Sequence, residues 1–348
     1  MKKRVTIRDV AKAAGVSSAT VSYVMNDLGK VTPEVDRLVR SAAQDLGYAR
    51  NRAAVSLKTG RHNVIGCILP TLVSPIFPEI AEAVQSHAES RGLATLLINS
   101  GDTPRREAEA LRMLADHGVD GAVAVLHPEF ETIGGQPRFP VVTIDGPLPG
   151  HDCIQAAHAD GGRLIAEYIR TLGHRRIGLL SGGDDIASSR ERRRGFLKAA
   201  AGFCDVVWEE TVPLTATLGP DAKRRMAQRD VSLVVCVNDL VAIGALSALR
   251  DLGIDVPGEV SVIGFDDIGM SAWPLIGLTT VRQSLIDLGR SAVDLLIQRI
   301  GGDTSPPHTI VLPVSLVERA TTAPHAAPPV SLASNRSRSL AKKGMSRN

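Results

Sequence analysis

The sequence predicts a small all-helical head, followed by a larger α/β body built on two parallel sheets. In residues 1–49 the apolar positions recur at helical spacing, and the start and stop signals are those of helices. Residues 64–316 alternate short apolar runs with longer amphipathic segments, which is the pattern of parallel strands covered by helices on both faces. Because that stretch is longer than one such sheet normally uses, two doubly wound parallel sheets are expected.

The head is expected to hold three helices, because helix start and stop signals occur there three times. Each helix begins at a side chain that can accept a hydrogen bond from the first turn. The first start has the spacing of a capping box, and the third has a proline at the first helical position. The signals, in chain order, are Thr6, Asp9 and Gly15, then Ser17 with an end near Met25, then Thr32, Pro33 and Gly47.

The body contains apolar runs that predict strands, separated by helical patterns. The predicted strands start at Val64, Ala94, Gly121, Val141, Ile177, Leu233, Val260 and Thr309. The predicted helices cover residues 79–91, 105–117, 162–172, 240–252 and 285–300. Strands that alternate with helices in this way favour βαβ units and parallel sheets.

Composition narrows the class of protein. The 348 residues are 44% hydrophobic and 22% charged, as in ordinary globular proteins, and no apolar run approaches the roughly 20 residues that span a bilayer. The basic N-terminus is not followed by the apolar stretch of a signal peptide, so a cytoplasmic protein is expected. The four cysteines show no CxxC pair or metal-binding spacing, and we expect buried free thiols, no metal and no cofactor.

Charge is distributed unevenly along the chain. Residues 1–62 carry a net charge of +7 and residues 321–348 carry +5, whereas the rest of the chain carries −9. A basic head on an acidic body indicates that the head meets a polyanion and the body does not, although a merely solvated basic surface is the alternative. The last segment is rich in Ala, Pro and Ser and is predicted to be a disordered tail.

The second predicted helix opens with small side chains, in the sequence VSSATVSYVMN from Val16 to Asn26. A short helix, a tight turn with a glycine and a second helix are typical of a helix-turn-helix, whose second helix lies in the DNA major groove. Small residues at its start would let the backbone approach DNA, while Val21 and Val24 would hold it to the head. A plain three-helix bundle has the same pattern and is the alternative.

Longer motifs make a family resemblance specific. The head sequences TIRDVAKAAGVSSATVSYVMN and VTPEVDRLVRSAAQDLGYARNRAAVSLKTGR are similar to the LacI/GalR family of bacterial transcription regulators, and so are LGHRRIGLLSG, VCVNDLVAIGALSAL, VPGEVSVIGFDD and LPVSLVERATT. The resemblance covers residues 5–322 and implies a core with two lobes like those of periplasmic sugar-binding proteins. The implied segments are a DNA-binding head at 1–49, a hinge at 50–62, a core at 63–320 and a tail at 321–348, with lobe 1 at about 63–157 and 285–312 and lobe 2 at about 158–284 and 313–320.

The resemblance also implies which residues meet DNA. Base contacts are assigned to Ser18, Ala19, Thr20 and Tyr23, and phosphate contacts to Ser17, Ser22 and Asn26. Tyr23 stands where the family often has Arg or His, and a phenol cannot make the bidentate contact of Arg with guanine. In the hinge, Leu57 would wedge into the minor groove and Lys58 would supply charge.

Strand ends indicate a ligand site in the body, because ligands of open parallel sheets bind beyond the carboxyl ends of the strands. Polar residues at predicted strand ends are Asn99 or Ser100, Asp145, Asn238 with Asp239, and Asp266 with Asp267. Carboxylates and amides suit sugar hydroxyls, which both donate and accept hydrogen bonds. The resemblance implies an effector site formed by Ser74, Phe77, Asp145, Ser188, Arg192, Asn238, Asp266 and Gln283.

Simpler interpretations exist for some of these residues. Arg192 stands in a run of arginines and could be a solvated surface side chain, and Asp266 could cap a helix. The chain also departs from the family at Ile76, where an aromatic residue is frequent, and at residues 157–158, where Asp-Asn is frequent. Three histidines are expected to be surface or capping side chains without a catalytic partner: His117, His158 and His174.

The favoured function is a homodimeric transcription regulator, and the resemblance makes it a repressor that binds a near-palindromic double-stranded DNA operator. A small effector, a pentose or hexose, would shift the two lobes and change operator affinity, and no membrane is involved. A sugar transport receptor would have similar lobes but not the basic head. An enzyme is disfavoured, because the sequence has no GxGxxG after the first strand, no GxxxxGK(S/T) and no GxSxG.

Overall fold

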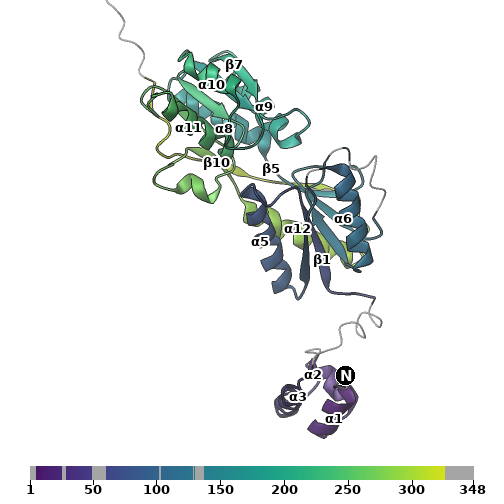
Figure 1. The fold of residues 1–348 in the computed structure, drawn as a ribbon. Helices are drawn as coiled ribbons and strands as arrows, with labels where there is room; N and C mark the ends of the chain where they lie inside the picture. Colours follow the sequence, from purple (N-terminus) through teal and green to yellow (C-terminus); the bar gives the residue numbers. More distant parts are fainter. Residues whose placement is uncertain are drawn as a thin grey trace, which may run out of the picture. The chain divides into compact units, whose positions relative to one another are not determined.

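The computed structural model describes residues 5–25, 29–48, 60–101, 103–127, 129 and 137–325. The chain divides into two compact units, Met1–Asn63 and Val64–Asn348 (Figure 1). The first is helical, and the second combines helices with two parallel sheets and one short antiparallel pair. The predicted fold class is therefore confirmed.

The first unit contains helices at the three predicted places, α1 (Ile7–Ala14), α2 (Ser18–Met25) and α3 (Pro33–Asp45). Thr6 and Asp9 form the capping box, and Gly15 takes the left-handed conformation that ends α1. Thr32 accepts a hydrogen bond from the Val35 N–H at the start of α3. The core of the unit is formed by small apolar side chains from all three helices: Val10, Ala11, Ala14, Val21, Val24, Val39 and Ala43.

The first lobe of the second unit has a six-stranded parallel sheet in the order β11-β5-β4-β3-β1-β2. Its strands are β1 (Val64–Leu69), β2 (Ala94–Asn99), β3 (Gly121–Ala124), β4 (Val141–Ile144), β5 (Asp152–Ala156) and β11 (Thr309–Leu312). One face packs on α5 (Ile76–Ser90) and α12 (Leu285–Ile300), and the other packs on α6 (Pro104–Asp116). Because both faces are covered, the neighbouring strands β1 and β3 are apolar along their whole length.

The second lobe has a four-stranded parallel sheet in the order β7-β6-β8-β9. Its strands are β6 (Arg176–Ser181), β7 (Asp205–Thr211), β8 (Leu233–Cys236) and β9 (Ser261–Ile263). One face packs on α8 (His158–Thr171) and α9 (Ala187–Ala200), and the other packs on α10 (Pro220–Ala227) and α11 (Asp239–Asp251). The two lobes therefore repeat the same three-layer plan.

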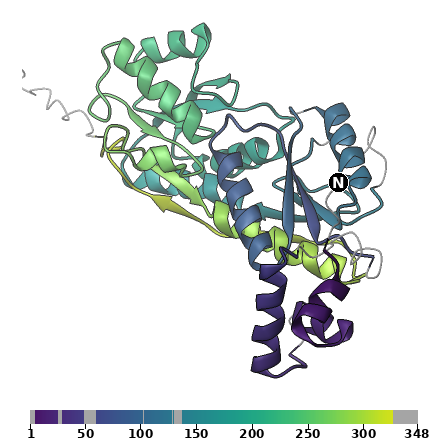
Figure 2. The ribbon, with the colours of Figure 1, turned by 60° about the horizontal axis from the view of Figure 1, so that its bottom comes forward.

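The chain passes between the lobes three times, after β5, after β10 (Thr280–Gln283) and after β11. Figure 2 shows the green and yellow segments that run from one lobe to the other. The antiparallel pair of β10 with β12 (Val314–Val317) packs against the core of the second lobe. These passages bring residues that are distant in the sequence to the junction of the lobes.

Several elements are not predicted by the local sequence pattern: β5, β7, β10, β12, α9 and α10. Two of these strands carry acidic residues that arginines from elsewhere neutralise. Asp152 in β5 pairs with Arg299 of α12, and Glu209 in β7 pairs with Arg193 of α9. Because such partners are far away in the sequence, the polar residues look like loop residues until the fold is known.

The C-terminal segment is ordered beyond the point where the tail was expected to begin. Thr321 and Thr322 are 4% and 9% exposed. The Thr321 hydroxyl donates to the backbone oxygen of Val262 at 2.8 Å, and the Thr322 hydroxyl lies 2.9 Å from that of Thr279. Residues 321–325 therefore belong to the second lobe, and residues 326–348 of the expected tail lie outside the described residues.

Candidate effector site and DNA-facing helix

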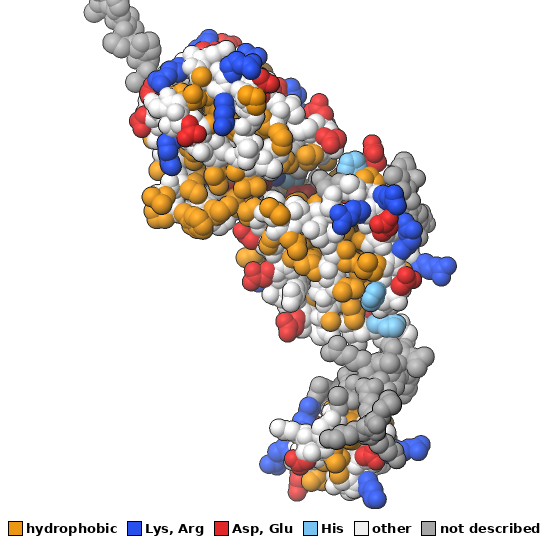
Figure 3. Space-filling view, viewed as in Figure 1, with side chains coloured by type: hydrophobic (Ala, Val, Ile, Leu, Met, Phe, Trp, Pro, Cys, Tyr) orange, Lys and Arg blue, Asp and Glu red, His pale blue; other side chains and the backbone are white. Residues whose placement is uncertain are grey.

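Two acidic side chains at the strand ends have unusual backbone conformations. Asp145 follows β4 with φ of 55°, and Asp266 follows β9 with φ of 122°. Residues other than glycine rarely adopt positive φ, and such residues concentrate at functional sites. Figure 3 shows a hollow between the two lobes with acidic side chains at its floor. Position and backbone strain both mark these carboxylates as candidates for ligand contact.

Side chains from both lobes form one chain of hydrogen bonds at this junction. His158 Nε2 lies 3.0 Å from Oδ1 of Asp145, and Arg192 Nε donates to His158 Nδ1 at 3.3 Å. On its other side, Arg192 Nη2 lies 2.9 Å from Oδ1 of Asp266. Gln283 Nε2 donates to the same oxygen at 2.8 Å. We call Asp145, His158, Arg192, Asp266 and Gln283 the cleft network.

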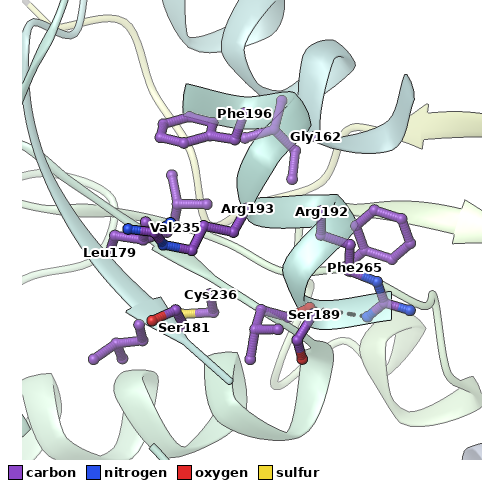
Figure 4. A pocket seen from close by; sticks show the side chains of 13 residues that line it. Gly162, Leu179, Ser181, Ser189, Arg192, Arg193, Phe196, Val235, Cys236 and Phe265 are labelled. Atoms are coloured by element: carbon purple, nitrogen blue, oxygen red, sulfur yellow. Dashed lines mark hydrogen bonds between the residues drawn. The ribbon is translucent and has the colours of Figure 1, made fainter. Parts of the chain in front are cut away.

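Arg192 is the centre of the cleft network. Its side chain is 10% exposed, and its Nη1 donates to the backbone oxygen of Val237 at 2.9 Å. The guanidinium carbon lies 3.8 Å from the centre of the Phe265 ring, and Figure 4 shows the two side chains next to each other. The ion pair with Asp266 offsets the positive charge of Arg192, and the Phe265 ring stacks on the guanidinium group and fixes its orientation. Arg192 is therefore a fixed, buried side chain rather than a solvated one.

Burial and charge act in opposite directions on the two carboxylates. Burial raises the pKa of Asp266 to about 6, although the positive charge of Arg192 acts to lower it. Burial also acts to raise the pKa of Asp145, but His158, Arg192 and the N–H of Ala156 outweigh it and hold that pKa below its ordinary value. Each lobe therefore contributes a largely ionised carboxylate to the junction at neutral pH.

The cavity drawn in Figure 4 lies behind Arg192, inside the second lobe. Its volume is about 20 Å³, and side chains such as Leu179, Phe196 and Val235 line it. A space of that size holds about one water molecule. It is a packing gap in the core of the lobe and is too small for an effector.

The leading edge of α2 is exposed, whereas the face that meets the rest of the head is buried. Ser17 caps the helix, because its Oγ accepts from the Thr20 N–H at 3.0 Å. Ser17, Ser18 and Ala19 are exposed, and Val21 and Val24 are buried. The small side chains at this end leave the helix start open to a close approach by a DNA backbone.

Tyr23 lies further along α2 and is 38% exposed. The Nζ atom of Lys30 lies 5.5 Å from the centre of its ring, within the range of a cation–π contact. Ser22 is half-buried. The remaining candidates for DNA contact lie outside the described residues: Asn26, Leu57 and Lys58.

Two family models match the chain: bacterial regulatory proteins of the lacI family at residues 6–51, and a periplasmic binding protein-like domain at residues 166–322. The HTH-type transcriptional repressor PurR of Haemophilus influenzae (strain PittEE) is 34% identical over 305 residues, which cover 85% of this chain and 91% of that protein. PurR of Pasteurella multocida (strain Pm70) is 34% identical over 326 residues, covering 90% and 97%. The chain belongs to the lacI family of bacterial regulatory proteins.

Solved structures of transcription regulators share this fold. The lac repressor dimer bound to operator and the anti-inducer ONPF aligns with a TM-score of 0.79 and 29% identity, over 92% of this chain and 100% of that one. The complex of the transcriptional regulator CelR with cellobiose aligns with a TM-score of 0.68 and 28% identity, over 91% and 100%. The predicted family is confirmed, and the protein is a DNA-binding transcriptional regulator.

In this lacI-family regulator the neighbouring strand-end residues have structural partners. Asn238 caps α11 through its Oδ1, which accepts from the N–H of the third residue that follows it. Fully buried Asp239 accepts three hydrogen bonds from neighbouring hydroxyls and backbone. Asp267 forms ion pairs with Arg282 and Arg319. Of the paired carboxylates Asp266 and Asp267, only Asp266 belongs to the cleft network.

Three further predicted effector contacts lie apart from the cleft network. Ser74 and Phe77 form the turn that opens α5, where the Phe77 N–H donates to the Ser74 oxygen at 3.2 Å. Ser188 lies in the first turn of α9 and is half-buried. Within the described part of the chain, none of the three forms a hydrogen bond with the network. Their role as effector contacts stays a prediction.

The expectation that His158 is a surface or capping side chain is wrong. His158 is 5% exposed and lies between Asp145 and Arg192. It is the first residue of α8 and comes two positions after the end of β5, the strand that the sequence pattern does not reveal. A strand prediction at residues 152–156 would have placed His158 among the strand-end polar residues.

Of the other two predicted surface or capping histidines, His117 is exposed as expected, whereas His174 is buried. His117 is exposed and bonds to the backbone oxygen of Met113 at the end of α6, as expected. His174 is only 2% exposed, and its ring bonds to the Ser232 hydroxyl at 2.8 Å. Burial lowers the pKa of His174 to about 4, so this ring is neutral at pH 7 and belongs to the core.

The cysteines are free, and Cys67, Cys153 and Cys236 are buried. Burial raises the pKa of the Cys67 thiol to about 12, which makes it unreactive. Among the described residues, no three or more His, Cys, Asp or Glu side chains are grouped so that they could hold a metal ion. In that same part of the chain, no helix has both the length and the apolar character that crossing a membrane requires.

Proposed function

We propose that this regulator is a repressor whose operator affinity is controlled by a sugar bound at the cleft network. The observation that carries the proposal is the network itself, in which a carboxylate of one lobe and a carboxylate, a guanidinium and an amide of the other converge. Sugar hydroxyls bind such groups, because each hydroxyl donates one hydrogen bond and accepts others. A similar regulator, CelR, has been solved with cellobiose.

The sugar acts by favouring one arrangement of the lobes. Hydroxyls that bind Asp145 in the first lobe and Asp266 in the second can be satisfied together only at one separation of the lobes. A ligand shifts an equilibrium only by its difference in affinity for the two states, and ligand and operator must then affect each other's affinity equally. In the proposal the hinge at 50–62, with Leu57 and Lys58, transmits this change to the DNA-binding head.

The DNA-binding form in the proposal is a homodimer in the cytoplasm on a near-palindromic operator. Two heads related by a two-fold axis read two half-sites. Bases are read by Ser18, Ala19, Thr20 and Tyr23, and phosphates are bound by Ser17, Ser22 and Asn26. The effector is bound and released without chemical change, as suits a regulator whose relatives are repressors.

An exposed apolar surface on the second lobe supports the dimer. Trp273 and Leu275, which follow β9, are 57% and 93% exposed. Figure 3 shows hydrophobic side chains gathered on this lobe beside β10. Exposed apolar patches of this kind mark interaction surfaces. We expect Leu275→Glu to give a monomer in analytical ultracentrifugation, and Ile286→Glu, at another exposed apolar residue, to leave the dimer intact.

Operator titration tests the sugar-controlled repressor. Fluorescence anisotropy measures the Kd of a labelled near-palindromic operator, alone and with each member of a panel of pentoses and hexoses. We expect at least one sugar to change the Kd by about ten-fold or more, which is about 1.4 kcal/mol of coupling. Asp266→Ala should abolish the change, and Asp251→Ala at the exposed end of α11 should retain it. If no sugar alters the operator Kd, the proposed effector class is wrong.

A further inference from the structure

Most of the donor capacity of Arg192 is already taken by the protein. Of its five N–H groups, one donates to His158, one to the Val237 oxygen and one to Asp266. The guanidinium charge is offset by the Asp266 carboxylate at 2.9 Å. Arginine binds a phosphate or a carboxylate through two parallel N–H groups, and Arg192 therefore has no such pair of N–H groups free for a ligand.

The hydrogen bonds of His158 determine its protonation. Arg192 Nε can only donate, so His158 Nδ1 must accept. The ring proton then lies on Nε2, which donates to Asp145 Oδ1 at 3.0 Å. His158 is thus an uncharged ring that occupies one donor of the arginine, and it adds no positive charge to the cleft.

The atoms of the cleft network that have no hydrogen-bond partner in the described part of the chain are mainly acceptor oxygens. The Oδ2 atoms of Asp145 and Asp266 accept no hydrogen bond within the described part of the chain. Gln283 is 3% exposed, and its Oε1 is buried with no hydrogen-bond partner among the described residues. Buried polar atoms are normally paired, so a ligand that completes this site must bring donors. Two carboxylates against one guanidinium also leave an excess negative charge, which disfavours an anion.

We propose that the cleft network selects an uncharged, hydroxyl-rich effector and excludes the phosphorylated or carboxylated form of the same sugar, with His158 as the positioning residue that sets this preference. The inference rests on the proposed function, in which a sugar binds at this site. His158 acts through Arg192: it occupies Nε and so keeps the guanidinium turned toward Asp266. A side chain without an acceptor at this position frees that donor for an anionic group.

Isothermal titration calorimetry with matched probes tests the preference. The probes are D-ribose with ribose 5-phosphate, D-glucose with glucose 6-phosphate and gluconate, and D-xylose with xylonate. We expect at least one neutral sugar to bind, and its anionic partners to bind at least about ten-fold more weakly, because an unpaired charge is costly to bury. An anionic probe that binds as tightly as its neutral partner overturns the inference.

Two substitutions at position 158 separate positioning from folding. His158→Ala removes the acceptor for Arg192, and we expect the preference for the neutral probe to shrink several-fold. His158→Asn places an oxygen near the position of Nδ1, and we expect it to retain the preference even where affinity falls. His117→Ala, on the exposed end of α6, is the control and should behave as the parent protein. If His158→Ala keeps the full preference while thermal unfolding shows it folded, His158 does not set it.

The outcomes also distinguish this inference from the proposed function. When an anionic probe binds best and changes operator affinity, the effector site stands and only the charge preference fails. When neutral sugars bind with the expected preference but leave operator affinity unchanged, the control of DNA binding fails and the inference stands. When no probe binds, the sugar site and the inference that rests on it both fail.

Discussion

Arg192 and Asp266 form an ion pair across the second lobe, with Nη2 2.9 Å from Oδ1 and both side chains at most 10% exposed. Arg192 comes from a helix and Asp266 from the loop after β9, so the pair joins two segments that are 74 positions apart in the chain. A buried pair of this kind is costly to break, because the remaining charge is left without a partner.

Removing one partner of this pair should destabilise the protein strongly. For Arg192→Ala we expect a loss of about 3–5 kcal/mol in the free energy of unfolding, measured with urea, because Asp266 is left buried and unpaired. The double variant Arg192→Ala/Asp266→Ala should recover part of the loss. A double variant that is as unstable as the sum of the single variants would show that the pair is not coupled.

The contact between α8 and α9 should tolerate no added methyl group. A Cβ on Gly195 would collide with the backbone of Ala159, and this contact lies between the two helices that carry His158 and Arg192. We expect Gly195→Ala to cost about 1–3 kcal/mol of unfolding free energy and to weaken effector binding. Gly219→Ala, where a Cβ meets nothing within 4 Å, should cost at most about 1 kcal/mol. Equal costs for the two variants would rule out the steric explanation.

Tyr23 should influence which operator is preferred without supporting the fold. Its ring is 38% exposed and contacts Lys30, so its replacement leaves the core of the head intact. We expect Tyr23→Arg to shift the preferred base at one position of a randomised operator by about 1–3 kcal/mol, toward guanine. Selection and sequencing of bound DNA measures the shift, and thermal unfolding controls for stability. An unchanged preference would mean that Tyr23 reads no base.

The raised pKa of Asp239 should make the free energy of unfolding fall as pH rises. Burial, together with the nearby charge of Asp266, raises the pKa of Asp239 to about 7, above the ordinary value of about 3.9 in an unfolded chain. The folded protein therefore holds this proton more tightly, and the stabilising contribution is complete below about pH 4 and lost as pH rises through 7.

Replacing Asp239 removes this contribution. Relative to the parent, the unfolding free energy of Asp239→Asn should rise between pH 4 and 7, by an amount on the order of a few kcal/mol. Urea unfolding at several pH values measures the trend. Asp251→Asn, on the exposed end of the same helix, should follow the parent at every pH. A constant difference between Asp239→Asn and the parent would contradict the raised pKa.

Much of the fold follows from local sequence signals. The pairs Thr6 with Asp9 and Thr32 with Pro33 start helices at the predicted residues. The apolar run from Val64 forms a central strand with the predicted start. Cap geometry and continuous apolar runs depend on neighbours in the chain, so the sequence alone determines them. The motifs along residues 5–322, taken in their order, were also sufficient to predict the family.

Only the tertiary structure determined which polar side chains contact each other and which of them are buried. Asp239 and Asp266 both follow predicted strands, yet Asp239 accepts hydrogen bonds from the segment after β9 and from β10, whereas Asp266 forms an ion pair with an arginine of α9. His158 follows a strand hidden by the acidic residue Asp152, whose partner Arg299 is 147 positions away. Whether a polar residue is buried depends on partners supplied by distant segments. The sequence by itself therefore determined many of the elements, the fold class and the family, and only the packing of the lobes joined His158 to Asp145 and Arg192.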